Sequence, residues 1–162
     1  MHHIHGDLLA LAATGEFDLI AHGCNCQGTM GAGIALQIKR RFPLAAAIDE
    51  PGAAPGTISA VLLPTGLTIV NAYTQIHWGA ASAEQRALSP VNDYAEPLPD
   101  TQENRYRFIR SCMREIRRHF PHKRIGLPLI GCGLAGGDWA VVEPIIAEEL
   151  AGCAVTVVLF KA

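Results

Sequence analysis

The chain has 162 residues, of which 49% are hydrophobic, and its formal net charge is −2. A chain of this length normally forms one domain with its own core, so we expect residues 1–162 to be a single domain. The charge balance and a pI near 6.4 argue against a general nucleic-acid-binding protein, which usually has a strongly basic surface. No apolar run reaches the ~20 residues that span a bilayer, and the N-terminus lacks a signal-peptide pattern. We therefore expect a cytoplasmic protein with no membrane partner.

The first half of the chain alternates short apolar runs with turn residues. Pro43 marks a break, and Pro64-Thr65-Gly66 is typical of a hairpin turn. In chain order we expect a strand at 2–5, a helix at 8–11, a strand at 17–23, a helix at 32–42, a short helix and turn within 43–56, and strands at 57–63 and 67–74.

The second half begins with a long stretch, residues 78–104, that has no hydrophobic periodicity; loops of this length are usually functional or disordered. An amphipathic helix follows at 104–120, with an arginine-rich side that we interpret as a solvated face. A strand at 124–130, a glycine-rich loop at 131–137, a helix at 139–150 and a strand at 154–160 complete the chain. This alternation predicts an α/β fold, a three-layer α/β/α sandwich with a mixed central sheet.

Two glycine-rich loops each connect a predicted strand to a predicted helix. The first lies within residues 22–36 and the second within residues 131–137. Open α/β sheets bind ligands at the carboxyl ends of their strands, and the N-terminus of a helix offers free N–H groups to an anion. Two such loops indicate a ligand with more than one phosphate.

Several familiar sites are missing from the sequence. It has no P-loop, no HExxH zinc motif, no GxSxG nucleophile elbow and no thiol-phosphatase loop, and the first glycine loop does not match the dinucleotide GxGxxG pattern. His22, Cys24 and Cys26 alternate at a strand end, but paired CxxC spacing is absent, so we expect no metal and interpret the cysteines as packing residues.

A few polar residues at predicted strand ends are candidates for ligand contacts. The Asn25 amide can both donate to and accept from a ribose hydroxyl, although such a residue is often only part of a turn. Asp7 suits an exocyclic amine, or simply caps a helix. Gln75, His77 and Trp78 follow another strand and can reach the same rim, Trp78 also being a common packing residue.

Three segments together resemble the macrodomain family, and the likeness covers nearly the whole chain. They are Gly6-Asp7-Leu8-Leu9, the run His22-Gly-Cys-Asn-Cys-Gln-Gly-Thr-Met-Gly-Ala-Gly-Ile-Ala35, and the run Leu127-Pro-Leu-Ile-Gly-Cys-Gly-Leu-Ala-Gly-Gly-Asp-Trp139. The resemblance implies a mixed sheet between helices and the binding of ADP-ribose or its derivatives.

The resemblance also implies roles for individual residues. Asp7 matches the position that contacts the adenine amine, Asn25 the one that holds the distal ribose, and Phe160 an aromatic that packs on adenine. The two glycine loops hold the diphosphate. The implied ligand-binding set is Asp7, Leu8, Asn25, Gly31, Ala32, Gly33, Ile34, Gln75, Gly131, Cys132, Gly133, Leu134, Ala135, Gly136 and Phe160.

Within the family, the first glycine run is most similar to yeast-type phosphatases of ADP-ribose-1''-phosphate. We therefore expect hydrolysis of that phosphate, largely by positioning and without cofactor or metal. His22 is the expected orienting or protonating residue because its unperturbed pKa lies near working pH. Asn25 is expected to fix the ribose. His77 and Asp138 are further catalytic candidates, Asp138 being also a simple helix cap.

Two alternatives stay open: a non-catalytic reader of ADP-ribose, and a hydrolase that removes ADP-ribose from protein or nucleic acid. Terminal ADP-ribose glycohydrolases and DNA-directed antitoxins share the Gly-Cys-Gly-Leu run. That group has a lysine where this chain has Gln75, and some of its members have an acid at the position of Ala135. Both departures argue against a lysine-dependent mechanism. The physiological substrate, the oligomeric state and the role of loop 78–104 are left open.

Overall fold

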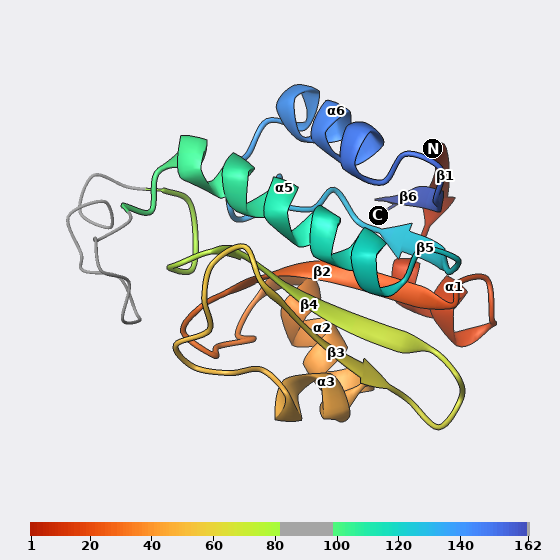
Figure 1. Ribbon diagram of the computed structural model, residues 1–162. Coiled ribbons are helices and arrows are strands. Elements are labelled where there is room, and N and C mark those ends of the chain that lie inside the picture. The colour runs from red at the N-terminus through yellow and green to blue at the C-terminus, as the bar shows by residue number, and fades with distance from the viewer. Residues whose placement is uncertain (82–98, 162) are drawn as a thin grey trace.

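A six-stranded sheet in the order β1-β6-β5-β2-β4-β3 forms the middle layer of the computed structural model, which describes residues 1–81 and 99–161 (Figure 1). Every neighbouring pair is parallel except β3 and β4, which are antiparallel and form the predicted hairpin. The mixed sheet is therefore confirmed. Its strands are β1 (His2–Gly6), β2 (Leu19–Asn25), β3 (Ile58–Leu62), β4 (Thr68–Gln75), β5 (Arg124–Leu127) and β6 (Ala154–Phe160).

Helices cover both faces of this sheet, as Figure 1 shows. The helices α5 (Gln102–His119) and α6 (Trp139–Glu149) pack on one face over one apolar core. The helices α1 (Leu8–Ala13), α2 (Gly33–Arg41) and α3 (Pro43–Ala47) contribute to a second core on the other face. Two cores on opposite sides of one sheet make the three-layer α/β/α sandwich that the sequence predicts.

The observed element ends differ from the predicted ones for identifiable reasons. β2 continues to Asn25, so residues 22–25 of the glycine-rich segment are strand and not loop. β5 ends at Leu127 because the next residue, Pro128, has no N–H for the ladder. Pro43 does not merely interrupt the chain: it is the first residue of α3, where its missing N–H costs nothing. The loop predicted at 78–104 ends earlier than expected, because α5 already begins at Gln102. Residues 82–98 of this stretch lie outside the described residues.

The parallel strands bring the predicted site residues to one edge. β1, β2, β4, β5 and β6 all run in the same direction, so their carboxyl ends lie along one side of the sheet. Helices α1 and α2 begin at this edge, and the glycine-rich loop after β5 lies there too. None of the helices in the described ranges is long and apolar enough to cross a membrane.

Candidate functional site

A cavity of about 910 Å³ lies along the carboxyl edge of the sheet. Its walls reach from Gly6, at the end of β1, to Gln75, at the end of β4. These strands are four places apart in the sheet, which corresponds to about 19 Å at roughly 4.8 Å per strand. The volume is in the range of small-molecule sites, and the length suits an elongated ligand.

The first glycine loop presents an open helix N-terminus to this cavity. Ala32 caps α2 without a side-chain hydrogen bond, so no side chain of the cap occupies the N–H groups of the first turn. Gly33 has φ 57°, a left-handed conformation that a β-carbon would strain. These N–H groups and the positive end of the helix dipole favour an anion in the cavity.

The second glycine loop faces the first across the cavity. Within the part of the chain that the structure describes, the N–H groups of Gly133, Leu134 and Ala135 make no hydrogen bond. The loop is closed by the Gly137 N–H, which donates to the Gly131 carbonyl at 2.9 Å. A β-carbon built on Gly33 would lie 3.4 Å from Leu134 Cδ1, so the two loops are in contact range. Together they form a nest of backbone donors suited to a diphosphate.

Asp7 and Phe160 lie at the β1 end of the cavity. One carboxylate oxygen of Asp7 caps α1 by accepting from the N–H groups of Leu9 at 2.8 Å and Ala10 at 3.0 Å. The other oxygen accepts no hydrogen bond from the described residues, so the capping role and a ligand role are compatible. Phe160 pairs in register with Gly6, just before Asp7, and its side chain is 72% exposed. An exposed aromatic ring beside an acceptor suits a nucleobase.

Asn25 lies near the β4 end, where the pairing of β2 and β4 is irregular. Cys24 is opposite Tyr73, but Asn25 is opposite Gln75, and such a bulge re-aims side chains near a site. The Asn25 Nδ2 donates to the Thr29 Oγ1 at 2.9 Å, and its Oδ1 accepts from the Gln27 N–H at 3.0 Å. Asn25 is thus held in one orientation at the cavity wall.

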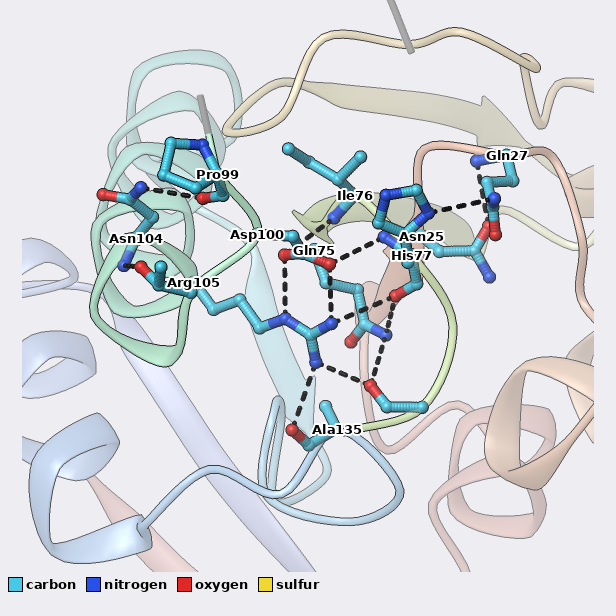
Figure 2. Close-up of polar contacts among 12 residues, drawn as sticks. Asn25, Gln27, Gln75, Ile76, His77, Pro99, Asp100, Asn104, Arg105 and Ala135 are labelled. Atoms are coloured by element: carbon cyan, nitrogen blue, oxygen red, sulfur yellow. Dashed lines mark hydrogen bonds and ion pairs between the residues drawn. The ribbon is translucent and has the colours of Figure 1, made fainter. Parts of the chain in front are cut away.

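A buried ion pair, Asp100–Arg105, supports the wall next to Gln75 (Figure 2). The Gln75 Nε2 donates to the His77 carbonyl at 2.7 Å, so this amide fixes the loop after β4 as well as lining the cavity. Burial alone would raise the pKa of Asp100, but the Arg105 guanidinium and the His77 N–H outweigh it and lower that pKa below its ordinary value.

Arg105 is also a correction to the prediction of a solvated arginine face. It is 1% exposed, and it lies four residues before Ile109 on the buried stripe of α5. That spacing was the available signal, because residues four apart share a helix face.

His22 lies outside the cavity wall. Its side chain is fully buried and places Nε2 2.7 Å from Asn71 Oδ1. Burial lowers the pKa of His22 to about 4, although the Asn71 contact opposes this, so it is neutral at working pH. We therefore interpret this buried ring as a structural residue, and its predicted orienting or protonating function stays a prediction to which this geometry adds no support.

Three other predicted residues also lie outside the cavity wall. His77 is buried, and its Nδ1 accepts from the Gln27 Nε2 at 3.1 Å. Asp138 caps α6 by accepting from the Ala140 N–H at 2.9 Å, which is its simpler interpretation. Gly136 forms the turn that follows the donor nest. Of the four catalytic candidates, only Asn25 lines the cavity.

The remaining predicted ligand residues all line the cavity. Other lining residues were not predicted individually; most of them lie inside the three segments that carry the family resemblance, and only Gln37, Trp78, Gly79 and Val158 lie outside those segments. The additional lining residues are Gly6, Leu9, Gly23, Cys24, Thr29, Ala35, Gln37, Trp78, Gly79, Pro128, Leu129, Ile130 and Val158, of which Trp78 had been placed only at the rim.

The described wall of the cavity has few ionisable groups: Asp7 and two thiols, Cys24 and Cys132. Burial raises the pKa of Cys24 well above its ordinary value and that of Cys132 to about 11, so neither is a thiolate at neutral pH. Among the described residues, no group of three or more His, Cys, Asp or Glu side chains could hold a metal. Apart from the Asp7 carboxylate, the described wall therefore presents backbone amides and neutral side chains.

Comparisons with known proteins agree with this geometry. No family model matches the chain. It is 28% identical over 148 residues to an uncharacterised 17.5 kDa protein of phage T4, covering 89% of this chain and 86% of the other. It is 24% identical over 150 residues to the ADP-ribose 1''-phosphate phosphatase of Saccharomyces cerevisiae, covering 83% and 84%.

Solved structures share the architecture over nearly the whole chain. The macrodomain of Thermus aquaticus DarG superposes with a TM-score of 0.67 at 24% identity and covers 99% of this chain and 97% of its own. Thermosipho africanus DarTG in complex with ADP-ribose superposes with a TM-score of 0.69 at 17% identity, covering 98% of this chain and 40% of its own.

Proposed function

Because this chain has the macrodomain fold, we propose that it binds ADP-ribose along the carboxyl edge of the sheet. One observation carries this proposal: two glycine loops with unoccupied backbone donors face each other across the cavity. They are the first turn of α2, which begins at Gly33, and the segment 133–135. A diphosphate between them would accept hydrogen bonds from both sides without any cationic side chain.

The ends of the cavity differ in a way that suits an asymmetric nucleotide. At the β1 end, the unoccupied oxygen of Asp7 can accept from the adenine amine while Phe160 packs on the ring. At the β4 end, Asn25 and Thr29 offer neutral polar groups to a ribose. The span of about 19 Å between these ends suits an adenosine and a ribose joined by a diphosphate.

The proposed reaction is hydrolysis of ADP-ribose-1''-phosphate to ADP-ribose and inorganic phosphate. Its support is the similarity to the yeast enzyme of that name together with the donor-rich cavity. A water oxygen forms a bond to phosphorus, the bond from phosphorus to the ribosyl oxygen breaks, and that oxygen takes a proton. Phosphoryl transfer of this kind needs little covalent help, so positioning and amide donors supply the catalysis.

The test is a paired measurement on the purified protein. Calorimetry follows ADP-ribose binding, and a phosphate assay follows turnover of ADP-ribose-1''-phosphate. The informative variant is Asp7→Asn, because asparagine still caps α1 but presents an N–H where adenine needs an acceptor. We expect its affinity for ADP-ribose to fall about tenfold, the effect of one lost hydrogen bond near 1.4 kcal/mol.

The matched control is Asp138→Asn, which changes the N-cap of α6 outside the cavity. It should leave binding unchanged. Binding without phosphate release would leave a reader or a hydrolase of attached ADP-ribose, and release of ADP-ribose from a modified protein or nucleic acid would identify the latter. Absence of binding in the wild-type protein would refute the proposal.

A further inference from the structure

The guanidinium of Arg105 is buried behind the β4 end of the cavity, and all five of its N–H donors are used. Its Nε donates to Asp100 Oδ1 at 2.9 Å, and its Nη2 donates to Asp100 Oδ2 at 2.7 Å. This bidentate pair compensates the burial of both charges, which would otherwise be costly. Pairing with Asp100 uses only two of the five donors, so the other three donors indicate the further function of Arg105.

Those three donors connect two separate loops. Nη1 donates to the Gly79 carbonyl at 2.6 Å and to the Ala135 carbonyl at 3.2 Å, and Nη2 donates to the His77 carbonyl at 3.3 Å (Figure 2). Gly79 belongs to the loop after β4, whereas Ala135 belongs to the second glycine loop. Both line the cavity, so one buried side chain ties together two parts of its wall.

Asp100 binds backbone N–H groups of the same loop after β4, whereas Arg105 binds its carbonyls. Its Oδ2 accepts from the His77 N–H at 2.9 Å, and its Oδ1 accepts from the Ile76 N–H at 3.3 Å. The Gln75 side chain adds a bond to the His77 carbonyl. The loop after β4 is therefore fixed through both its N–H and its carbonyl groups.

We propose that Arg105 is a positioning residue that sets the spacing between Gly79 and Ala135 and thereby the width of the β4 half of the cavity. The inference rests on the proposed function, since that half would take the distal ribose of ADP-ribose. Among the hydrogen bonds of the described residues, none joins Asp7 or Phe160 in the β1 half to Arg105 or Asp100. A change at Arg105 should therefore weaken binding of the complete ligand and leave binding of its adenosine part nearly unchanged.

The chemistry requires arginine and not only a positive charge. A lysine in the same place keeps the ion pair with Asp100, but its ammonium has three donors for five acceptors. Arg105→Lys should therefore fold while losing at least two of these five hydrogen bonds, at least one of them to a carbonyl if the ion pair is kept. The matched control is Arg110→Lys on the same helix, where Arg110 pairs with Glu148 and Glu149 on α6.

The experiment measures binding of ADP-ribose by calorimetry and binding of adenosine by NMR titration, for both variants and the wild type. We expect Arg105→Lys to weaken ADP-ribose binding about tenfold or more and to change adenosine binding less than about twofold, because adenosine has no phosphate to reach the second glycine loop and does not extend into the β4 half. A merely structural role would weaken both ligands equally. Equal losses, or unchanged ADP-ribose binding, would overturn the proposal.

Amide hydrogen exchange on the ligand-free proteins separates this inference from the proposed function. The N–H groups of Ile76 and His77 should exchange faster in Arg105→Lys than in the wild type or in Arg110→Lys. Unchanged exchange overturns the inference even if ADP-ribose binds; faster exchange with no ADP-ribose binding refutes only the proposed function. If Arg105→Lys does not fold, Asp100→Asn is measured in the same way, with the same expectations.

Discussion

His22 links the stability of the protein to pH through a single buried ring. Its Nε2 contacts Asn71 Oδ1 at 2.7 Å, and the Asn71 Nδ2 in turn donates to the Ala45 carbonyl at 2.8 Å. The Asn71 oxygen therefore faces His22, which donates from Nε2 as a neutral imidazole. The change to make is His22→Gln, because a glutamine amide can still donate to Asn71 but does not titrate.

The size of the effect follows from the pKa of His22, which burial lowers from 6.5 to about 4. Because this pKa is lower in the folded state, the unfolded chain binds the proton first as the pH falls. Above pH 6.5 the ring is neutral in both states and contributes nothing. Each pH unit between 6.5 and 4 then removes about 1.4 kcal/mol of stability, roughly 3 kcal/mol in all.

The assay is urea unfolding of the wild type and His22→Gln at several pH values from 7.5 to 4.5. Relative to the variant, the wild type should lose about 2 kcal/mol of unfolding free energy between pH 7.5 and pH 5. His122→Gln, which changes an exposed histidine, controls for the loss of one histidine. If the difference in unfolding free energy between the wild type and His22→Gln is the same at every pH, protonation of His22 is not coupled to stability. That result would refute the structural assignment of His22.

Two glycine substitutions should have different consequences. In Gly137→Ala the new β-carbon would collide with the Gly131 carbonyl, so the second glycine loop must open. Calorimetry should then show ADP-ribose affinity lowered by about tenfold or more. Unchanged affinity would contradict a preformed donor nest. In Gly126→Ala the β-carbon would lie 2.6 Å from the Phe17 ring, so thermal unfolding should show about 1–3 kcal/mol less unfolding free energy than the wild type. ADP-ribose binding at neutral pH should be retained. A stability equal to the wild type would contradict the close packing of Phe17.

The fold and the positions of both glycine loops were predictable because local sequence determines them. Alternating strands and helices, the Pro64–Gly66 turn and glycines that follow strands are patterns within a few residues of each other. The parallel sheet then brings these strand ends together without further information. For this reason Asn25, Asp7 and most residues of the two glycine loops lie at one cavity, while their binding roles stay predictions.

The chemistry of individual side chains was less predictable because it depends on distant partners. Whether His22 is a free titrating group or a buried neutral one is decided by its burial in the folded structure, where its side-chain partner Asn71 is 49 residues away. Arg105 acts through Gly79 and Ala135, which are 26 and 30 residues away and supply only backbone carbonyls. A carbonyl acceptor leaves no trace in residue type, so no sequence motif can report such contacts.

The balance of charge in the cavity explains how a site without described cationic side chains can both hold an anion and orient it. In the proposed complex, the phosphate charge would be met by the backbone amides of the first turn of α2 and of the segment 133–135, which need no rearrangement. Direction would come from Asp7 at the β1 end, the one carboxylate of the described wall. Its charge would repel phosphate groups and its free oxygen would accept from an amine, so a nucleotide entering in the reverse sense would lose the adenine contact and gain a repulsion. On this proposal, neutral donors supply the affinity and one fixed charge supplies the orientation.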